Sequence, residues 1–328
     1  MSAGLSAERR RAMLRTAMGP EIAAALAEPA VIEIMVNPDG ALRLDVLGEG
    51  RVDTDVRVEP AQVERIIRLV ASHARAEVHG DAPIVSAELP PHAEGKAGER
   101  FEGILPPVAT APCFAIRKPA ERIYTLADYV GDGFMSPATA DCLRRAVRDR
   151  RNILVAGGTS SGKTTLANAL LAEMAEIDER VILIEDTREL QSPARDTVAL
   201  RTRPGIVGMT ELVRSTLRMR PDRIIVGEVR GREALDMLKA WNTGHPGGIA
   251  TVHANSALSA LYRIEQLIQE AVVTVPRHLI AEAIDLVVFI AGRGLARRVE
   301  TVARVAGLDP DGNYIVLNLS DPHAPQGE

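Results

Sequence analysis

The sequence predicts an α/β protein in two parts, a small mixed α/β N-terminal domain and a larger domain built on a mainly parallel sheet. Beyond about residue 150, short apolar runs alternate with helix-forming segments, which is typical of parallel strands covered by helices on both faces. The apolar run 152–156 leads directly into a glycine-rich turn and a helix former. The first hundred residues instead carry a hairpin signal and loop-linked strands, which indicates a separate domain.

The N-terminal domain is expected over residues 1–118. Its first helix ends before Pro29, because proline cannot continue a helix. The segment from Asn37 to Gly40 is a strong turn signal between two strand-like runs and predicts a hairpin. The expected elements are a helix at 7–26, strands at 31–36 and 41–46, a helix from 60 to about 74, loop-linked strands between 83 and 99, and strands at 99–105 and 113–117.

Residues 119–136 are expected to form a linker, 137–320 the second domain and 321–328 a disordered tail. Ser136 and Pro137 predict a helix start, because serine caps the helix and proline suits its first position. Ligands of such sheets bind at the carboxyl ends of the strands. The expected strands lie at 152–156, 181–185, 198–201, 223–227 and 248–253, the helices near 137–150, 163–176, 209–220, 231–242 and 256–272, and added strands at 285–290, 297–306 and 314–319.

Composition narrows the class of protein. The 328 residues are 46% hydrophobic and 25% charged, without an apolar run long enough to span a membrane or a signal-peptide pattern. The formal net charge of −5 and the 3% of aromatic residues argue against direct nucleic-acid binding. Cys113 and Cys142 make no disulfide framework and fit a reducing compartment, so we expect a cytoplasmic protein.

The glycine-rich turn fits the phosphate-binding pattern G-x-x-x-x-G-K-[ST] without a mismatch. A chance glycine-rich turn would lack the strand before it and the helix after it. Lys163 is expected to reach the β and γ phosphates of ATP, and the Thr164 hydroxyl to ligate Mg²⁺. The residues expected to bind the nucleotide are Gly157, Gly158, Thr159, Ser160, Ser161, Gly162, Lys163, Thr164 and Thr165.

Carboxylates follow two of the predicted strands. Glu228 ends the run 223–227, and we expect it to polarise the attacking water and share in holding Mg²⁺. A structural reading pairs Glu228 with Arg230 instead. Glu185 and Asp186 end the run 181–184, where they either order water or Mg²⁺ or cap a turn through backbone N–H groups.

A histidine and several arginines complete the candidate set. His253 ends the strand 248–253 and could contact the γ-phosphate, although a single histidine is more often structural. Phosphoryl transfer builds negative charge that an arginine stabilises, but spacing does not choose among the candidates. These are Arg188, Arg201, Arg203, Arg218, Arg220 and Arg230 in the second domain and Arg100 and Arg117 in the first.

Four blocks together resemble the secretion traffic ATPases of type IV secretion, type II secretion and type IV pili. The blocks are 157–165, 184–190, 220–231 and 247–255, in this order. The opening Glu33 to Gly40 resembles the N-terminal domain of the conjugative-transfer, TrbB-type members. The sequence also lacks the tetracysteine insert found in many type II secretion members, which favours the conjugative branch.

The resemblance implies a RecA-like P-loop ATPase domain, a ring of six subunits, and a nucleotide held between the two domains of one subunit. Glu228 matches the catalytic glutamate of the family's variant Walker B motif, and Glu185, Asp186 and Glu189 match its acidic box. His253 matches the family's motif histidine. Arg100 and Arg117 fall where N-terminal-domain arginines of the family reach the phosphates.

The implied function is that of an ATP-hydrolysing ring motor that energises a conjugative type IV secretion system, in substrate transfer, pilus assembly or both. Its partners would be inner-membrane components of the secretion channel, met peripherally at the cytoplasmic face, with the linker as a hinge between the domains. The alternatives are a type II secretion or type IV pilus ATPase, or a RecA-like motor that translocates nucleic acid.

Ser160 departs from the family's loop, which commonly has glycine there. If this position needs a positive φ, serine costs about 1 kcal/mol of strain. We therefore expect turnover that is equal to or slower than that of a glycine-containing loop, with nucleotide binding retained.

Overall fold

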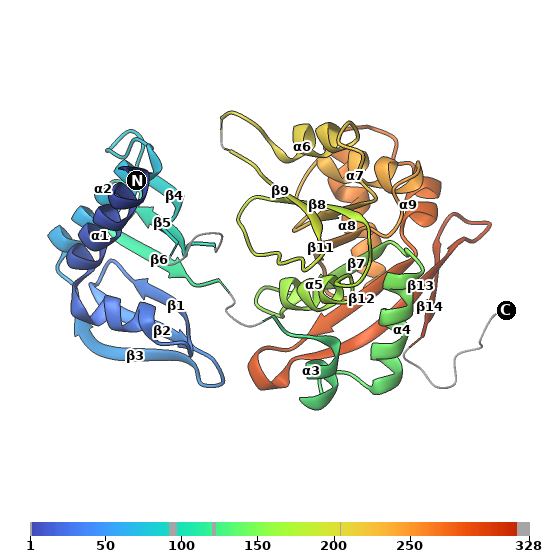
Figure 1. Ribbon diagram of the computed structural model, residues 1–328, viewed down its shortest axis with the longest axis horizontal. Helices are drawn as coiled ribbons and strands as arrows, with labels where there is room; N and C mark the ends of the chain where they lie inside the picture. Colours follow the sequence, from blue (N-terminus) through green and yellow to red (C-terminus); the bar gives the residue numbers. More distant parts are fainter. Residues whose placement is uncertain (1, 92–96, 120–122, 204, 320–328) are drawn as a thin grey trace. The chain divides into compact units, whose positions relative to one another are not determined.

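The computed structural model describes residues 2–91, 97–119, 123–203 and 205–319, and the predicted tail at 321–328 lies outside them. The chain divides into two compact units, Met1–Glu121 and Arg122–Glu328 (Figure 1). No helix within the described ranges is long and apolar enough to cross a membrane.

The first unit is a six-stranded sheet in the order β3-β2-β1-β6-β5-β4, with every neighbouring pair antiparallel. Helices α1 and α2 contact each other, and their apolar side chains join those of the strands in one core. From α2, Ile66, Ile67 and Val70 are fully buried, as the helical spacing of apolar residues predicts. The elements are α1 (Ser2–Ala27), β1 (Val31–Val36), β2 (Ala41–Val46), β3 (Gly50–Arg57), α2 (Pro60–Ala74), β4 (Ile84–Glu88), β5 (Arg100–Ile104) and β6 (Cys113–Arg117).

Two elements of this unit differ from the sequence prediction. Helix α1 is kinked, because Gly19 has φ 81° and ψ 171° and is followed by Pro20. Strand β3 was not predicted. It is an edge strand whose residues are exposed or half-buried throughout, so it carries no run of buried apolar residues that the sequence could reveal.

The second unit contains an eight-stranded sheet in the order β14-β13-β12-β7-β11-β10-β8-β9. The strands from β12 to β9 are parallel, and β13 and β14 are added antiparallel at one edge, which confirms the predicted fold class. The elements are α3 (Leu126–Gly131), α4 (Pro137–Arg148), β7 (Ile153–Gly157), α5 (Lys163–Ala172), β8 (Arg180–Glu185), β9 (Asp196–Arg201), α6 (Met209–Thr216), β10 (Arg223–Val226), α7 (Glu233–Asn242), β11 (Ile249–His253), α8 (Ala257–Gln269), α9 (Arg277–Ala283), β12 (Leu286–Ala291), η1 (Gly294–Ala296), β13 (Arg298–Leu308) and β14 (Tyr314–Asn318).

The parallel sheet has a core on each face. Alternate residues of β7 enter different cores: Leu154 packs with α6 to α9, whereas Ile153 and Val155 pack with α3 to α5. Because successive side chains of a strand point to opposite faces, a run that is buried throughout marks a strand covered on both sides. This burial explains the unbroken apolar runs from which the sheet was predicted.

Helix α3 lies inside the segment expected to be a linker, and it belongs to the second unit. Thr125 caps it, accepting a hydrogen bond from the Asp128 backbone while the Asp128 carboxylate accepts one from the Thr125 backbone. Leu126 and Tyr129 are fully buried in the core that contains α4 and α5. The second unit therefore begins about a dozen residues earlier than the predicted domain.

Candidate active site

The phosphate loop connects the carboxyl end of β7 to α5. In the sheet, β7 lies between β11 and β12. Gly157 must be glycine, since a Cβ there would lie 2.5 Å from the Ile290 carbonyl oxygen and from the Ser161 hydroxyl. Gly162 takes the left-handed conformation, with φ 95°, and starts α5 without a side-chain cap. The first N–H groups of α5 are therefore available to an anion. Gly158, Thr159 and Ser160 are exposed.

Ser160 has φ 61°, so the position does require the left-handed conformation. The positive φ on which the predicted strain depended is therefore present. A non-glycine residue held there costs roughly 1 kcal/mol.

Lys163 turns back into the loop. Only 8% of it is exposed, and its Nζ donates a hydrogen bond to the Gly158 carbonyl at 3.0 Å. The same Nζ lies 3.3 Å from Nδ1 of His253. Thr164, the next residue of α5, is half-buried.

His253 connects Lys163 to Glu228. Its Nε2 lies 2.8 Å from Oε1 of Glu228. Burial lowers the pKa of His253, and the Lys163 charge lowers it further, against an opposing contribution from Glu228. We therefore assign a neutral ring that accepts a hydrogen bond from Lys163 and lies beside Glu228, whose buried Oε1 has no hydrogen-bond partner among the described residues.

Glu228 is also paired with Arg230, as its structural reading predicted. Its Oε2 accepts a 2.8 Å hydrogen bond from Nε of Arg230 and a second one from the guanidinium Nη2. Arg230 in turn lies 3.7 Å from Asp186, which accepts a 2.8 Å hydrogen bond from Thr202. One arginine thus joins the ends of β8 and β10. The sequence predicted the pairing of Arg230 with Glu228 as one alternative, but not its approach to Asp186 or the contribution of Thr202.

Glu185 occupies a different environment from Glu228. It is 4% exposed, and its Oε1 accepts hydrogen bonds from the backbone of Glu189 at 2.9 Å and of Leu190 at 2.7 Å. Burial raises the pKa of Glu185 to about 7, against the effect of these two donors. Its side chain also lies against Gly227, where a Cβ would be 3.0 Å from its Cγ. This geometry favours the turn-capping role over water activation.

The remaining arginines of the second unit lie at two opposite ends of the parallel strands. Arg201 ends β9 in register with Glu185, at the edge that carries the phosphate loop. Arg203 lies in the turn after β9. Arg188 is close enough to Glu185 for its charge to lower the pKa of that carboxyl group. Arg218 and Arg220 precede the start of β10 and therefore lie at the opposite edge.

Arg100 and Arg117 are paired within the first unit. They are direct cross-strand partners on β5 and β6, flanked by Glu88 on β4 and Glu33 on β1. Like charges directly opposite each other in a sheet are unfavourable. The pair is therefore a good candidate for binding an anion.

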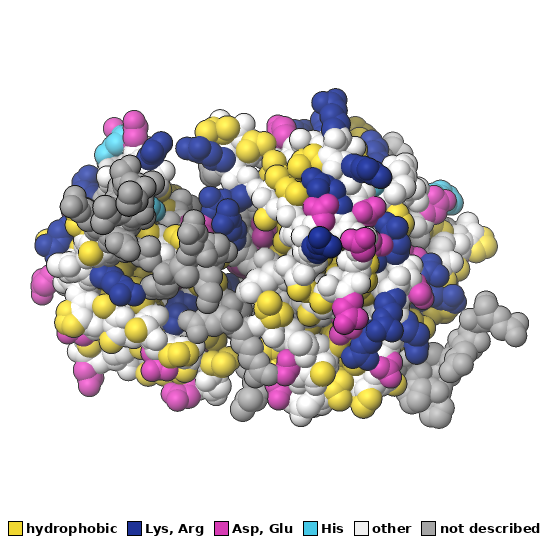
Figure 2. Space-filling model, in the orientation of Figure 1, with side chains coloured by type: hydrophobic (Ala, Val, Ile, Leu, Met, Phe, Trp, Pro, Cys, Tyr) yellow, Lys and Arg dark blue, Asp and Glu magenta, His cyan; other side chains and the backbone are white. Residues whose placement is uncertain are grey.

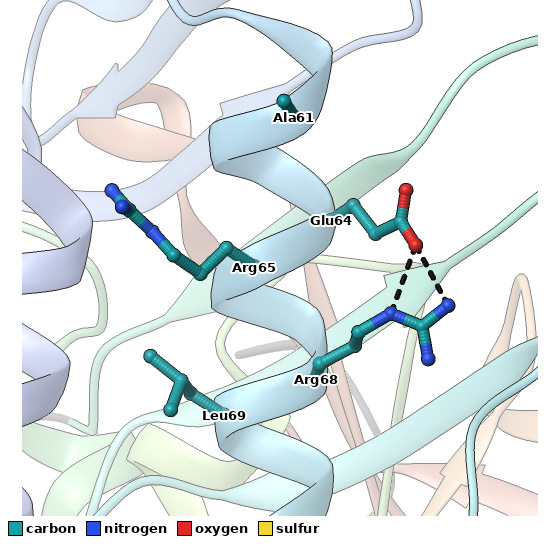
Figure 3. Close-up of a pocket in the computed structure, with 5 residues that line it drawn as sticks. All are labelled: Ala61, Glu64, Arg65, Arg68 and Leu69. Carbon is teal, nitrogen blue, oxygen red and sulfur yellow. Dashed lines mark hydrogen bonds and ion pairs between the residues drawn. The ribbon is translucent and has the colours of Figure 1, made fainter.

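A hollow on α2 contains none of these residues. Ala61, Glu64, Arg65, Arg68 and Leu69 line it, all from this one helix, and Arg68 donates to Glu64 at 2.8 Å (Figure 3). It is a surface depression of the first unit and is not part of the phosphate-loop site.

A parallel sheet of this order, a glycine loop between β7 and α5, and an acid after β10 define a P-loop ATPase with a RecA-like fold. The chain belongs to the family described as "Type II/IV secretion system protein", whose sequence model matches residues 54–314. It is an ATPase of the class that energises type IV secretion and conjugation.

Two relatives support this assignment, and one solved structure shares the fold. The chain is 47% identical over 296 residues to "Conjugal transfer protein TrbB" of Rhizobium radiobacter, covering 90% of each chain. It is 46% identical over 294 residues to "Probable conjugal transfer protein TrbB" of Sinorhizobium fredii, covering 89% of this chain and 88% of the relative. The pilus retraction motor PilT, solved with bound ADP, has a similar fold, with a TM-score of 0.62, 18% identity, and coverage of 91% of this chain and 81% of PilT.

Proposed function

We propose that this ATPase hydrolyses Mg²⁺-bound ATP at the phosphate loop of its second unit and drives a conjugal transfer apparatus. The observation that carries the proposal is the chain from Lys163 through His253 to Glu228, with separations of 3.3 and 2.8 Å. It supports the proposal because Lys163, the proposed phosphate-binding cation, and Glu228, the proposed general base, lie together at the carboxyl ends of the parallel strands. The relatives named for conjugal transfer support the system served.

The residues of the loop and the strand-end residues Glu228 and His253 have separate proposed roles. The backbone N–H groups and Lys163 bind the phosphates, with Thr164 and Glu228 as the residues to hold Mg²⁺. When bound, Mg²⁺ neutralises charge on the phosphate oxygens. Glu228 accepts the proton of the attacking water, and the neutral His253 packs beside its Oε1. Because Arg230 holds Oε2, Oε1 is the oxygen that accepts the proton.

Arg100 and Arg117 are proposed to supply positive charge to the phosphates from the first unit. The two arginines are direct cross-strand partners, so they present two positive charges side by side to an anion, between the carboxylates of Glu88 and Glu33. The proposed hinge is the segment between the two units, shorter than the predicted linker because α3 belongs to the second unit.

We further propose a homo-oligomer, in the form of a hexameric ring, that meets inner-membrane channel components at the cytoplasmic face. On the face of the second unit seen in Figure 2, acidic side chains lie among the basic ones. Together with the net charge of −5, this favours protein partners over a direct grip on nucleic acid.

The proposed base is tested by replacing Glu228 with glutamine. Glu228→Gln should keep ATP binding and lower turnover by roughly two or more decades, since the amide cannot accept the proton. Glu176→Gln, on an exposed glutamate of the same unit, is the matched control and should leave both quantities unchanged. A fall of less than about tenfold would move the role to Glu185. Stimulation of turnover by single-stranded DNA that is lost steeply with salt would favour the nucleic-acid motor.

A further inference from the structure

The turn after β12 places an arginine against the phosphate loop. Arg297 lies between η1 and β13. A Cβ built on Gly162 would lie 2.6 Å from Nε, 2.7 Å from Cζ and 3.0 Å from Nη1 of this arginine. Because three atoms of the planar guanidinium stand at nearly the same distance from that point, Gly162 faces the plane of the group and not its edge.

Gly162 is the residue that turns the loop into α5. Its φ of 95° sets the direction of the helix, which begins at Lys163 without a side-chain cap. A small rotation here would redirect the free N–H groups and the lysine together. Arg297 therefore packs on the residue whose conformation controls the phosphate site.

The charge of Arg297 is also kept close to the loop. Its Nε is buried, and its guanidinium lies beside the buried Tyr129 hydroxyl, close enough to act on that hydroxyl both as a charge and as a hydrogen-bonding group. Burial raises the pKa of Tyr129, and the nearby Arg297 charge opposes that rise. The next residue behaves differently, since Arg298 is exposed and pairs with Glu300 at 3.2 Å.

We propose that Arg297 is a positioning residue of the ATPase site, whose guanidinium plane holds the turn at Gly162 and whose charge favours a phosphate anion in the loop. The inference rests on the proposal that residues 157–165 hold the nucleotide. It adds a contribution from the β12–β13 connection, on the side of β7 away from β11, to a site otherwise built at the ends of β7, β8, β10 and β11.

Two variants separate the parts of this role. Arg297→Met keeps much of the length and loses both plane and charge, whereas Arg297→Lys keeps the charge and loses the plane. The dissociation constants for ADP and ATP are measured by displacement of a fluorescent nucleotide, and KM and kcat by phosphate release. We expect Arg297→Met to raise both dissociation constants and KM roughly tenfold, which corresponds to about 1.4 kcal/mol, with kcat changed less than about threefold. Arg297→Lys should fall between it and the unchanged protein.

The controls distinguish positioning from general damage. Arg298→Met, one residue away, should leave binding and turnover unchanged. Partial unfolding would reduce the number of active molecules, so it would lower kcat and leave KM alone. That result, or unchanged dissociation constants in both Arg297 variants, overturns the inference. Lys163→Ala serves as the reference: if it keeps nucleotide affinity, the proposed site itself is wrong, whereas if it alone loses affinity, only the role of Arg297 is wrong.

Discussion

At the residue scale, the close contacts of His253 with Lys163 and Glu228 depend on whether its ring is neutral or charged. An imidazolium would place an N–H facing the Lys163 ammonium at 3.3 Å, a repulsion that the partly exposed Glu228 only partly offsets. The lowered pKa of His253 expresses this balance. A neutral ring instead accepts a hydrogen bond from Lys163 and lies beside Glu228 without repelling the lysine. The histidine thus contacts both the proposed phosphate-binding lysine and the proposed general base.

Ser160 gives a prediction at the same scale. Ser160→Gly should raise the free energy of unfolding by up to about 1 kcal/mol, because relief of the strain at φ 61° exceeds the extra freedom of glycine in the unfolded chain. Denaturant unfolding measures this change. Turnover should stay equal or increase, with nucleotide affinity retained.

The adjacent Thr159 supplies the control for Ser160, because it lacks a positive φ. Thr159→Gly should lower the free energy of unfolding, since only the entropic cost of glycine remains. If both glycine variants were destabilised to the same extent, strain at Ser160 would be disproved.

At the scale of elements, Glu185 ties the end of β8 to the loop that follows it. The sequence has two acids here, Glu185 and Asp186, and left their role open. A carboxylate at a strand end can either order water or Mg²⁺ or accept hydrogen bonds from backbone N–H groups. Its backbone donors and burial are set by the packing of β8 beside β10, which no local pattern encodes. The pairing of Glu228 with Arg230 could be anticipated from their spacing of two residues, but the reach of Arg230 to Asp186 could not.

Glu185 also gives the chain a specific pH dependence. An acid whose pKa rises from 4.5 to about 7 on folding binds more protons in the folded state, so it lowers stability as the pH rises through this window. Glu185→Gln keeps an oxygen acceptor for the two backbone donors and removes the charge. The stability of this variant relative to the unchanged protein should therefore rise by up to about 3 kcal/mol between pH 4.5 and pH 8.

Denaturant unfolding of both proteins across this pH range measures the difference, and other carboxylates cancel in it. Glu176→Gln, at an exposed position, should give a flat difference. A flat difference for Glu185→Gln as well would mean that Glu185 is not buried as an acid with a raised pKa.

The elements themselves were predictable where local chemistry and burial agree. Strands β7, β8, β10, β11 and β12 are buried on two faces and therefore appear in the sequence as apolar runs. Strand β3 escaped because an edge strand exposes most of its side chains. Helix α3 escaped although its signal was present, since Thr125 and Asp128 form a capping box that the linker interpretation overlooked.

At the scale of the whole molecule, the division into two units and the proposed ring make turnover depend on assembly. If Arg100 and Arg117 of the first unit reach the phosphates only once neighbouring subunits of the proposed ring are in place, an isolated chain is a poor catalyst. Turnover per subunit, measured with Mg²⁺ over a dilution series, should rise with protein concentration and then saturate as rings form. Sedimentation on the same samples fixes the mass at each concentration, and Glu228→Gln gives the background rate. A rate that stays flat down to demonstrably monomeric chains would mean that each chain is a complete catalyst. The proposed coupling between ring assembly and hydrolysis would then be wrong, even though the phosphate loop itself would remain a working ATPase site.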